Sequence, residues 1–568
     1  MIVTITPAKL RGAITPPPSK SQAHRLLIAA ALAGGESVIY NVHHSKDIDA
    51  TVSCLRELGA AFQWEESTVT VTGMGANAMS PNRRMALPRL DCGESGSTLR
   101  FLIPIALAVR GGGIFAGAGR LMERPMEPYF EIFREKGIFY EQKEGTLTVQ
   151  GRLEPGVYHL PGNVSSQFFT GLLFALPLLD GPSAIIPTTE LESEGYIHMT
   201  LQAMAQFGVE MAATMSLPPQ YHPTGSQTYT PTEATVEADW SQAGFWYAAK
   251  ALGNEVDIKS ADPDSAQGDR IIAEYYVNLI KPGDVTIDVS GCPDLVPPLA
   301  VMAAVRQGRT RLCNAARLRM KESDRLAAAT DVLCKLKAKI TEGPDFLDIE
   351  GLPALPGGVT VDAHNDHRIA MMAAIAATAC EAPVTITGAE CVKKSYPNFW
   401  EDYVNRGGQI KRIYAMTLEP ITPDNWREAV FLTTDPERKN PLDQEWLCNN
   451  AFSMLQAIYE PEIHCRLIRA DGESVGFAMY EAWELKGGVP LLCRFMIDVD
   501  CQGKGYGAQA LPVVLEEMYQ KYGRRELYIT VEQANERAVR MYEKFGFRFT
   551  GEVDWDEAIY VLPAPENS

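Results

Sequence analysis

The chain has 568 residues, 46% of them hydrophobic, so it is too long for one domain and apolar enough for several cores. We expect about three or four compact units. Its 52 lysines and arginines stand against 71 acids, and the formal net charge of -19 argues against general binding to nucleic acid or to an anionic membrane.

The start of the chain and its cysteines narrow the cellular setting. The opening segment MIVTITPAKLRG has no apolar signal core, and no apolar run approaches the roughly 20 residues that cross a bilayer. We therefore predict a cytoplasmic protein without a membrane partner. The eleven cysteines form no Cys-x-x-Cys pair and no cluster with histidine, so we expect reduced thiols and no metal site.

A small, apolar helical pattern begins after the prolines at 16–18 and returns along the chain. Polar residues open each copy, small apolar residues continue it, and a glycine or similar break ends it before a strand-like run. The six copies occupy residues 19–35, 94–112, 164–181, 239–253, 293–308 and 365–382. A strand, a short loop and a second helix follow, so we predict an α/β repeat of about 70 residues that continues to about residue 412.

Polar side chains collect where the predicted helices begin. Equivalent helix ends in a repeat fold share a face, and helix N-termini with nearby cations favour anions. We therefore expect one basic cleft that binds more than one anion, for instance a phosphate beside a carboxylate. The residues expected there are Lys20, Ser21, Arg25, Arg100, Arg124, Ser165, Ser166, Gln167, Ser193, Tyr196, Asp294, Lys321, Glu322, Arg325, His367, Arg368 and Lys394.

Each of these residues also has a simpler interpretation. Ser19 or Ser21 can be an ordinary N-cap, with Lys20 and Arg25 reaching into solvent. The acids among them can be counter-ions of neighbouring cations, or they can act as general acids and bases. Unrelated solvated caps explain single positions, whereas a shared anion site explains all of them together.

Eight motifs, taken in order, resemble the 5-enolpyruvylshikimate-3-phosphate (EPSP) synthase family. They are SKSQAHR, GESGSTLRF, GRLMERP, GNVSSQFFTGLL, SGCPDL, RMKESDRL, NDHRIAMM and KKSYPNF. The resemblance covers residues 1 to about 412 and implies two lobes of six βαβαββ repeats, with crossings near residues 15–19 and 235–240. We assign residues 1–414 to this region, with lobe A at approximately 1–18 and 240–414 and lobe B at approximately 19–239.

The resemblance also implies a reaction. The family transfers the enolpyruvyl group of phosphoenolpyruvate to the 5-hydroxyl of shikimate 3-phosphate and releases phosphate, on the way to chorismate and the aromatic amino acids, without a metal or organic cofactor. Family positions place shikimate 3-phosphate against Lys20, Ser21, Arg25, Ser165, Ser166, Gln167, Ser193, Tyr196, Asp294 and Lys321. They place phosphoenolpyruvate against Lys20, Gly96, Arg124, Gln167, Arg325, Arg368 and Lys394.

By the same resemblance, Asp294 is the candidate base for the 5-hydroxyl. Glu322, with Lys20 or Lys394, is the candidate for proton transfer at the methylene carbon. The cations stabilise the departing phosphate, and closure of the lobes excludes water.

Two positions depart from the family pattern. Glu94 stands where many relatives have Asn, beside the phosphoenolpyruvate site, and Arg317 stands where some have Asn, near the shikimate phosphate.

The alternative within this fold is UDP-N-acetylglucosamine enolpyruvyl transferase, which commonly carries a reactive cysteine in the loop that matches residues 117–125. No cysteine occurs there.

A new strand-turn-helix pattern begins after Gly407 and Gly408, so we place a boundary near residue 414 and one further domain at 415–568. Within it, residues 493–518 predict a strand, a glycine-containing loop and an amphipathic helix. Backbone N–H groups from 502 to 508 can bind a pyrophosphate at the helix start, with Gly505 and Gly507 permitting close approach. A tight turn between strand and helix also favours glycine.

Together with LYITVEQANERAVRMYEKFGFRFTGE at 527–552, this loop resembles the GNAT superfamily of acetyl-CoA-dependent N-acetyltransferases, over residues 416–563. The resemblance implies a separate α/β domain in which Tyr542 protonates the departing coenzyme A thiolate. A tyrosine packed in the helix core is the alternative. The implied acetyl-CoA contacts are Gln502, Gly503, Lys504, Gly505, Tyr506, Gly507, Ala508 and Asn535.

The segments GFAMYEAW, RFMID and ANERAVRMYEKFGF resemble the spermine/spermidine acetyltransferase branch. This implies an amine or polyamine acceptor held by carboxylates, for which Glu481, Glu484 and Asp498 are candidates. All three can equally be solvated surface charges. A GNAT fold that only senses acyl-CoA, or that is only a structural appendage, is the alternative, and nothing in the sequence indicates an oligomeric state.

Overall fold

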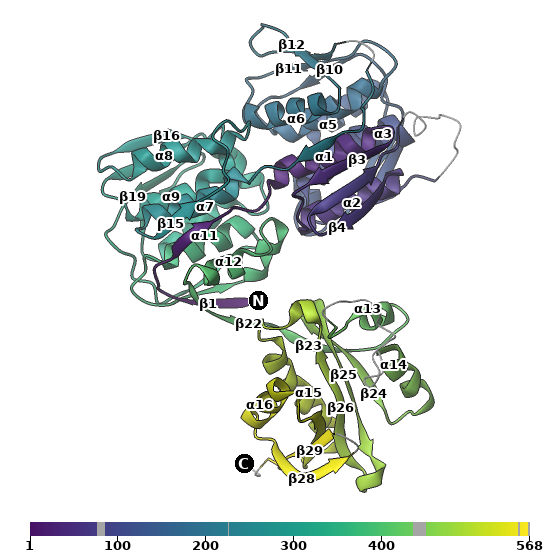
Figure 1. Ribbon diagram of the computed structural model, residues 1–568. Helices are drawn as coiled ribbons and strands as arrows, with labels where there is room; N and C mark the ends of the chain where they lie inside the picture. The colour runs from purple at the N-terminus through teal and green to yellow at the C-terminus, as the bar shows by residue number, and fades with distance from the viewer. Residues whose placement is uncertain (76–85, 225–226, 436–449, 555–556, 566–568) are drawn as a thin grey trace. The chain divides into compact units, whose positions relative to one another are not determined.

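The computed structural model describes residues 1–75, 86–224, 227–435, 450–554 and 557–565 (Figure 1). The chain forms two compact units. Val3–Lys411 make the N-terminal unit, and Arg412–Ser568 together with Met1–Ile2 make the C-terminal unit. Among the described residues, no helix is both long enough and apolar enough to cross a membrane.

Three four-stranded sheets and their helices make up residues 19–239, which we call lobe B. The strand orders are β14-β3-β5-β4, β6-β7-β9-β8 and β10-β11-β13-β12. The strands are β3 (Glu36–Tyr40), β4 (Ala61–Glu65), β5 (Thr68–Thr72), β6 (Arg89–Asp91), β7 (Gly112–Ala116), β8 (Phe139–Lys143), β9 (Thr146–Gln150), β10 (Val157–Leu160), β11 (Ala184–Pro187), β12 (Met211–Ala213), β13 (Tyr221–Pro223) and β14 (Glu233–Thr235). The helices are α1 (Lys20–Leu32), α2 (Lys46–Leu58), α3 (Gly96–Arg110), α4 (Glu127–Lys136), α5 (Ser166–Ala175) and α6 (Glu194–Gln206).

Each of these sheets combines a parallel pair of strands with an antiparallel hairpin. β6 runs parallel to β7, with Leu90 opposite Phe115, and α3 connects them because parallel strands need a crossover. β8 and β9 then pair antiparallel, with alternate residues of β9 buried. The predicted α/β repeat is confirmed, and its small, apolar helices α1, α3 and α5 are almost wholly buried in the lobe.

The rest of the N-terminal unit, which we call lobe A, holds sheets of order β15-β2, β16-β17-β19-β18 and β20-β21-β1-β22. Its strands are β1 (Ile2–Thr6), β2 (Arg11–Ile14), β15 (Glu255–Ile258), β16 (Val285–Asp288), β17 (Arg309–Cys313), β18 (Lys339–Glu342), β19 (Leu347–Glu350), β20 (Thr360–Asp362), β21 (Val384–Thr387) and β22 (Gln409–Ile413). Its helices are α7 (Trp240–Ala251), α8 (Ile272–Leu279), α9 (Val296–Val305), α10 (Arg325–Lys335), α11 (His367–Ala377) and α12 (Phe399–Asn405), with 3-10 turns η4 (Gly268–Ile271), η5 (Pro293–Leu295), η6 (Ala316–Met320) and η7 (Ala389–Lys394).

One repeat of lobe A is shorter than the others. Between Gly253 and Gly308, all of which the structure describes, the chain passes from α8 directly to β16 without an antiparallel hairpin. β15 therefore pairs only with β2, in parallel, with Val256 opposite Gly12. The missing hairpin explains why this interval of the sequence repeat is the shortest.

Two antiparallel segments connect the lobes. Pro18 and Ala238 form an isolated antiparallel bridge. The Ser19 amide donates to the Glu237 carbonyl at 2.7 Å, and the Asp239 amide donates to the Pro17 carbonyl at 2.8 Å. Because both segments lead directly into the first turns of helices α1 and α7, the ends of these helices lie next to each other at the junction of the lobes (Figure 1).

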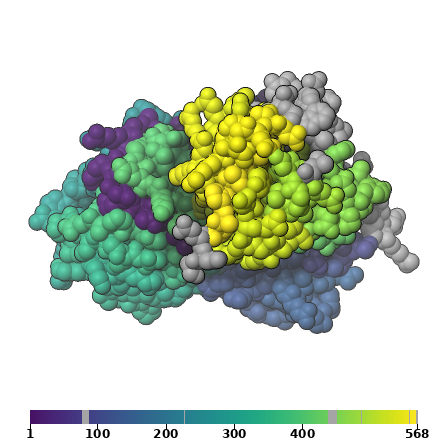
Figure 2. All heavy atoms as spheres, turned by 90° about the horizontal axis from the view of Figure 1, so that it is seen from below, coloured from purple at the N-terminus to yellow at the C-terminus, as the bar shows by residue number. Residues whose placement is uncertain are grey.

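The C-terminal unit has a seven-stranded sheet of order β23-β24-β25-β26-β27-β29-β28. Figure 2 shows residues after about 415, green to yellow, packed as one continuous body. The strands are β23 (Met416–Pro420), β24 (His464–Ala470), β25 (Glu473–Trp483), β26 (Val489–Ile497), β27 (Leu527–Glu532), β28 (Arg548–Asp554) and β29 (Glu557–Leu562). The helices are α13 (Trp426–Phe431), α14 (Asn450–Tyr459), α15 (Tyr506–Tyr522) and α16 (Glu536–Lys544).

The centre of this sheet opens between two parallel strands. β26 and β27 pair only at Leu491 with Tyr528 and at Leu492 with Ile529. Beyond these pairs β26 continues to Ile497 without pairing to β27 in the part of the chain that the structure describes. Their facing backbone groups are therefore available to a ligand that carries amide groups of its own.

Candidate active site

The N-terminal unit encloses one polar cavity of about 100 Å³ at the junction of its lobes. Every residue that the sequence placed at the helix starts lines it, with the exception of Lys394. Lobe B contributes the first turns of α1, α3 and α5, and lobe A contributes the region before α9 and the first turns of α10 and α11. The cavity is smaller than the roughly 300–1,000 Å³ of typical ligand pockets, and many of the charged side chains that line it are paired with one another.

Lys20 and Arg25 lie inside the protein, so the interpretation that places both in solvent is wrong. Ser19 caps α1 and accepts from an amide of the first turn, as the simple interpretation predicted. Lys20 Nζ pairs with Asp47 Oδ2 at 2.6 Å. Arg25 is 2% exposed, donates to the Ser21 carbonyl at 2.6 Å, and has its pKa lowered to about 10 by burial.

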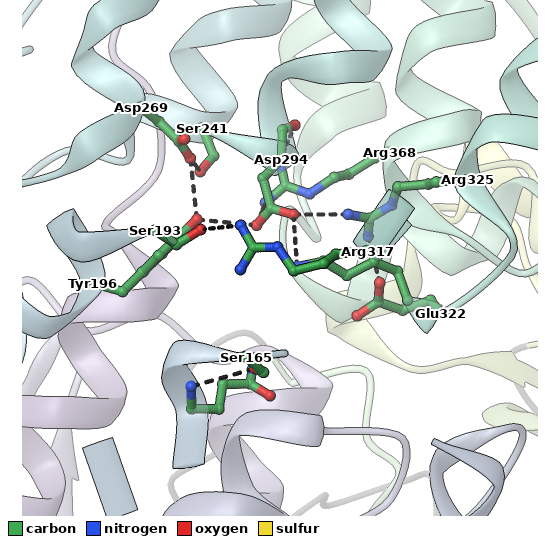
Figure 3. Close-up of polar contacts among 12 residues, drawn as sticks. Ser165, Ser193, Tyr196, Ser241, Asp269, Asp294, Arg317, Glu322, Arg325 and Arg368 are labelled. Atoms are coloured by element: carbon green, nitrogen blue, oxygen red, sulfur yellow. Dashed lines mark hydrogen bonds and ion pairs between the residues drawn. The ribbon is translucent and has the colours of Figure 1, made fainter. Parts of the chain in front are cut away.

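The Asp294 carboxylate is the shared partner of most of the cations on the lobe A side of the cavity (Figure 3). Its carboxylate accepts from Arg325 Nη1 at 2.7 Å, Arg368 Nη2 at 3.0 Å and the Tyr196 hydroxyl at 3.2 Å, and Lys321 Nζ lies 3.4 Å away. Burial works against ionisation, but Arg368, Lys321 and Arg325 outweigh it and hold the Asp294 pKa well below its ordinary value. Asp294 is therefore an ionised counter-ion in this arrangement.

Glu322 joins the two lobes through a second set of ion pairs. It pairs with Arg325 of lobe A, and its other oxygen lies 3.3 Å from Arg124 Nη2 of lobe B. Burial again opposes ionisation, while Arg325 and Arg124 hold the Glu322 pKa well below its ordinary value. Asp366 also holds Arg325 in place, because Asp366 Oδ2 accepts a hydrogen bond from Arg325 Nε at 2.8 Å.

The lobe B side of the cavity offers neutral donors and helix starts. Ser165 caps α5, and Gln167 in the first turn accepts from Arg100 Nη1 at 2.7 Å and donates to Ser97 Oγ at 3.0 Å. Ser193 begins α6 with a left-handed φ of 57° and forms no side-chain cap there. These groups can donate several hydrogen bonds to one phosphate.

Lys394 lies beside the cavity without lining it. Its Nζ is 2.8 Å from Glu94 Oε2 and donates to the Asn365 carbonyl at 2.7 Å. Asn365 also donates to Glu94 at 3.0 Å. Glu94, which stands where many relatives have Asn, is thus a lobe B counter-ion for Lys394 of lobe A.

Sequence reasoning missed three acids: Asp47 and Asp239, which line the cavity, and Asp269, which lies next to the lining residue Tyr196. Asp47 lines the cavity and pairs with Lys20, and its only signal is an acid in the first turn of α2. Asp269 is 3% exposed, accepts from Ser241, and lies 3.4 Å from the Tyr196 hydroxyl. Burial, and then the Asp294 charge, raise the Asp269 pKa to about 6. It lies in the 3-10 turn η4, outside the six repeated helix starts, so the repeat pattern did not indicate it.

A second cavity, of about 500 Å³, lies in the C-terminal unit where β26 and β27 diverge. It is lined by residues 492–497 of β26, 530–532 of β27, the loop before α15 and one side of α16. The predicted acetyl-CoA contacts that line it are Gln502, Gly503, Gly505, Tyr506, Gly507, Ala508 and Asn535. Lys504 is absent from the lining.

Backbone conformation requires glycine at two positions of the loop before α15, and one of them, Gly505, is among those that the sequence indicated. Gly503 and Gly505 adopt left-handed φ angles of 78° and 86°. Gly507 lies in the first turn of the helix, and a Cβ there would meet Ile497 Cγ1 and Met541 Sδ at 3.5 Å, an ordinary contact. Gly505 therefore needs glycine on backbone grounds, whereas Gly507 does not, and the close approach of a pyrophosphate to both stays a prediction.

Tyr542 belongs both to the cavity and to the hydrophobic core. It is 6% exposed and packs edge-on against Phe547, with ring centroids 5.7 Å apart. Burial raises its pKa above the ordinary value for tyrosine, so the hydroxyl stays protonated at neutral pH. The two sequence interpretations, a packed ring and a proton donor, are therefore compatible. Asn535 caps α16, with Oδ1 accepting from the Ala538 amide at 3.1 Å.

None of the three predicted acceptor acids lines this cavity. Asp498 is buried and accepts from the amides of Thr433 and Asp500, each at 3.0 Å, which is a structural role. Glu481 lies on β25 away from the lining, and burial raises its pKa. The acids that do line the cavity are Glu532 and Glu557.

Known proteins were compared with the chain to place this site in a family. The family model described as EPSP synthase (3-phosphoshikimate 1-carboxyvinyltransferase) matches residues 5–403. The chain belongs to the EPSP synthase family. A 3-phosphoshikimate 1-carboxyvinyltransferase of Clostridium kluyveri is 45% identical over 425 residues, which cover 72% of this chain and 98% of the relative. That of Clostridioides difficile is 43% identical over 427 residues, covering 72% and 97%.

Solved structures of the EPSP synthase family share the fold. EPSP synthase from Acinetobacter baumannii has a TM-score of 0.60 at 24% identity, covering 72% of this chain and all of the other. The enolpyruvyl transferase NikO from Streptomyces tendae has a TM-score of 0.56 at 17% identity, covering 72% and 98%. At these identities the likeness concerns the fold alone, and it confirms the predicted two-lobed enolpyruvyl transferase architecture.

Beyond the EPSP synthase region, the model of the acetyltransferase (GNAT) family matches residues 422–547. The match contains the glycine loop before α15, Asn535 and Tyr542. The C-terminal unit is therefore a GNAT domain with the α/β fold that the sequence predicted.

Proposed function

We propose that the N-terminal unit transfers the enolpyruvyl group of phosphoenolpyruvate to the 5-hydroxyl of shikimate 3-phosphate and releases phosphate. The observation that carries the proposal is the convergence of the cationic and serine residues from several repeats on one cavity. Two anionic substrates match this composition, because arginine forks suit phosphates and carboxylates. The substrate contacts of the family resemblance are proposed at these same residues.

The acids of the cavity are proposed to carry the protons. Asp294 takes the 5-hydroxyl proton as the oxygen bonds to C2 of phosphoenolpyruvate, and Glu322, with Lys20 or Lys394, protonates the methylene carbon. The tetrahedral intermediate then loses a proton from that carbon and expels phosphate. Substrate anions compete with the two acids for Arg325, Arg368 and Arg124, so binding raises the acids' pKa values towards a range useful for catalysis.

Phosphate release from the full chain tests this activity. The chain is mixed with phosphoenolpyruvate and either shikimate 3-phosphate or UDP-N-acetylglucosamine, and phosphate and product mass are followed. We expect turnover with shikimate 3-phosphate only. Turnover with the nucleotide sugar instead would favour the other enolpyruvyl transferase family, and turnover with neither would reject the proposal.

We further propose that the C-terminal unit transfers acetyl from acetyl-CoA to a primary amine, with polyamines the first acceptors to test. The open edge between β26 and β27 can pair with the amides of the coenzyme, and the start of α15 can bind its pyrophosphate. The amine attacks the thioester carbonyl, the C–S bond breaks, and Tyr542 gives its proton to the leaving thiolate. The amine proton passes to water.

Thiol release with a panel of amines tests this second activity. Tyr542→Phe keeps the ring but loses the hydroxyl, so coenzyme A release should fall about 10- to 100-fold while acetyl-CoA binding persists. Unchanged release in the variant would reject Tyr542 as the acid. Acetyl-CoA binding without turnover of any amine would favour a sensor.

The domain boundary at residue 414, the cytoplasmic location and the absence of a cofactor in the first reaction remain proposals. A boundary at residue 414 leaves strand β22 intact, because β22 ends at Ile413 and pairs with β1 in a sheet of lobe A.

A further inference from the structure

Asp269 is a buried acid of lobe A that the mechanism described above does not use. It lies in η4, is 3% exposed and does not line the active-site cavity. Its Oδ2 accepts hydrogen bonds from Ser241 and, at 3.4 Å, from the Tyr196 hydroxyl of lobe B. Its Oδ1 is buried without a hydrogen-bond partner among the described residues. A buried oxygen without a donor is costly for an ionised carboxylate, so this position favours the protonated acid.

The Tyr196 hydroxyl connects Asp269 to Asp294, the acid proposed to take the substrate proton. It lies 3.2 Å from Asp294 Oδ2 and 3.4 Å from Asp269 Oδ2 (Figure 3). A tyrosine hydroxyl has one hydrogen to donate, so it can satisfy only one of two ionised carboxylates at a time. The other acid completes the chain of hydrogen bonds when it is protonated and donates to the tyrosine oxygen. This geometry therefore suits one proton shared by two acids.

The surroundings of the two acids decide where this proton is held. Three cations contact Asp294, whereas Asp269 forms no ion pair in the part of the chain that the structure describes. Burial and then the Asp294 charge raise the Asp269 pKa to about 6, while the Asp294 pKa stays well below its ordinary value. The other titratable or charged groups that face Asp269 are Tyr196 on α6, Asp239 before α7, Cys292 before η5 and Arg368 on α11.

This chain of hydrogen bonds crosses the junction between the lobes. Tyr196 belongs to α6 of lobe B, whereas both acids belong to lobe A. The two elements meet through their backbones, since a Cβ added at Gly195 would lie 3.0 Å from the Gly268 backbone of η4. The connection between the acids is therefore complete only when the lobes are in contact.

We propose that Asp269 receives the proton that Asp294 takes from the substrate hydroxyl, by way of the Tyr196 hydroxyl. Asp294 first takes the proton as the substrate oxygen bonds to phosphoenolpyruvate. Tyr196 then accepts this proton on its oxygen and gives its own to Asp269 Oδ2, so Asp294 is ionised again. The proton returns along the same chain to water after product release. The inference rests on the proposed function, and Asp269 is a positioning residue because it acts through Tyr196.

The pH dependence of kcat in the full chain, with both substrates saturating, tests this relay. Only ionised Asp269 can accept the proton, so wild-type kcat should fall as pH drops through about 6. Asp269→Asn should lower kcat at pH 8 about 10- to 100-fold, leave both KM values unchanged and lose this step of the profile. Substrate phosphates also titrate near pH 6, and they do so equally in wild type and variant, so the difference between the two profiles isolates Asp269.

A second variant and a matched control accompany this measurement. Ser241→Ala keeps the acid but removes a hydrogen bond that favours its ionised form, so the fall in kcat should move up by about half to one pH unit. The control is Asp402→Asn. Asp402 is a half-buried acid of lobe A that accepts from the Tyr396 hydroxyl at 2.7 Å and does not line the cavity, so kcat and its profile should not change.

An unchanged kcat and profile in Asp269→Asn would overturn the inference, and so would a loss expressed in KM alone. If that variant does not fold, an unshifted profile in Ser241→Ala would overturn it. Wild-type chain without turnover at any pH would instead reject the reaction, and the relay with it.

Infrared titration of the chain without substrates separates the two proposals. It should show the carbonyl stretch of a protonated acid that titrates near pH 6, is missing in Asp269→Asn and persists in Asp402→Asn. This signal reports the proton site whether or not the reaction occurs. Its absence from the wild type would reject Asp269 as the proton acceptor and leave the proposed reaction in place.

Discussion

The acids in the cleft neutralise cations that the substrates also need. Asp294 and Glu322 keep depressed pKa values despite burial because arginines and lysines surround them. An isolated buried carboxylate would shift in the opposite direction, and Asp269 does so. Two environments in one cleft thus hold some carboxyls ionised and another partly protonated near neutral pH.

Glu94 should weaken phosphoenolpyruvate binding through its contact with Lys394. Glu94→Gln keeps the shape but removes the charge, so it should lower the KM for phosphoenolpyruvate about three- to tenfold, the size of one modest ion pair. Steady-state kinetics with both substrates varied measures this effect, and the KM for shikimate 3-phosphate serves as the internal control. An unchanged or higher KM for phosphoenolpyruvate would show that Glu94 does not compete for the lysine.

Asp269 should make stability depend on pH. Its pKa of about 6 lies above the ordinary aspartate pKa of about 3.9, so the folded protein holds this proton longer than the unfolded chain as pH rises. Its contribution to stability is therefore greatest below about pH 4 and is lost on passing through pH 6, by about 3 kcal/mol for two pKa units.

Asp269→Asn removes this titration. Because only the wild type loses this contribution, the free energy of unfolding of the variant minus that of the wild type should increase as pH rises from 4 to 7. Urea denaturation of the N-terminal unit at several pH values measures the difference. A difference that stays constant with pH would contradict the raised pKa.

The helices and loops that carry these groups were largely predictable. The six copies of the polar start and small, apolar helix marked α1, α3, α5, α7, α9 and α11, because capping and periodicity are local signals. The ion pairs were not predictable, since Lys394 and Glu94 are 300 residues apart in sequence and meet only through the fold. Asp47 lies in the first turn of α2 and Asp269 in the 3-10 turn η4, where an acid carries no specific signal.

For the loop before α15, the sequence also could not show which glycines the backbone conformation requires. The sequence indicated glycines, but only the φ angles separate Gly505, which needs glycine, from Gly507, which does not. Gly505→Ala should destabilise the C-terminal unit by about 1–2 kcal/mol, because alanine is strained at positive φ.

Gly507→Ala is the matched control for this loop. It lies in a helical turn with ordinary contacts, so its effect on the melting temperature of the C-terminal unit should be small or stabilising. Calorimetric melting of the full-length variants compares the two. Equal losses would show that side-chain room rather than backbone conformation selects these glycines.

The N-terminal unit as a whole places one reaction centre between two lobes built by repetition. Each repeat contributes a helix start. Lobe B supplies serines, Lys20 and three arginines, while lobe A supplies Asp294, Glu322 and the remaining cations. Ion pairs such as Arg124 with Glu322 join the lobes across the cavity. With the proposed substrate contacts, substrates would exchange with these pairs, so binding would be coupled to the relative position of the lobes.

The rate of enolpyruvyl transfer in Asp294→Asn and Glu322→Gln, measured beside calorimetric affinity for shikimate 3-phosphate, tests this account most directly. Proton transfer typically contributes about 10² to 10⁴ in rate, so both variants should lose turnover by this factor while their affinity changes far less. Wild-type turnover in either variant would remove that residue from the proton path. Losses of affinity as large as the losses of rate would show that the acids serve only to bind substrate and to balance the charge of the cleft.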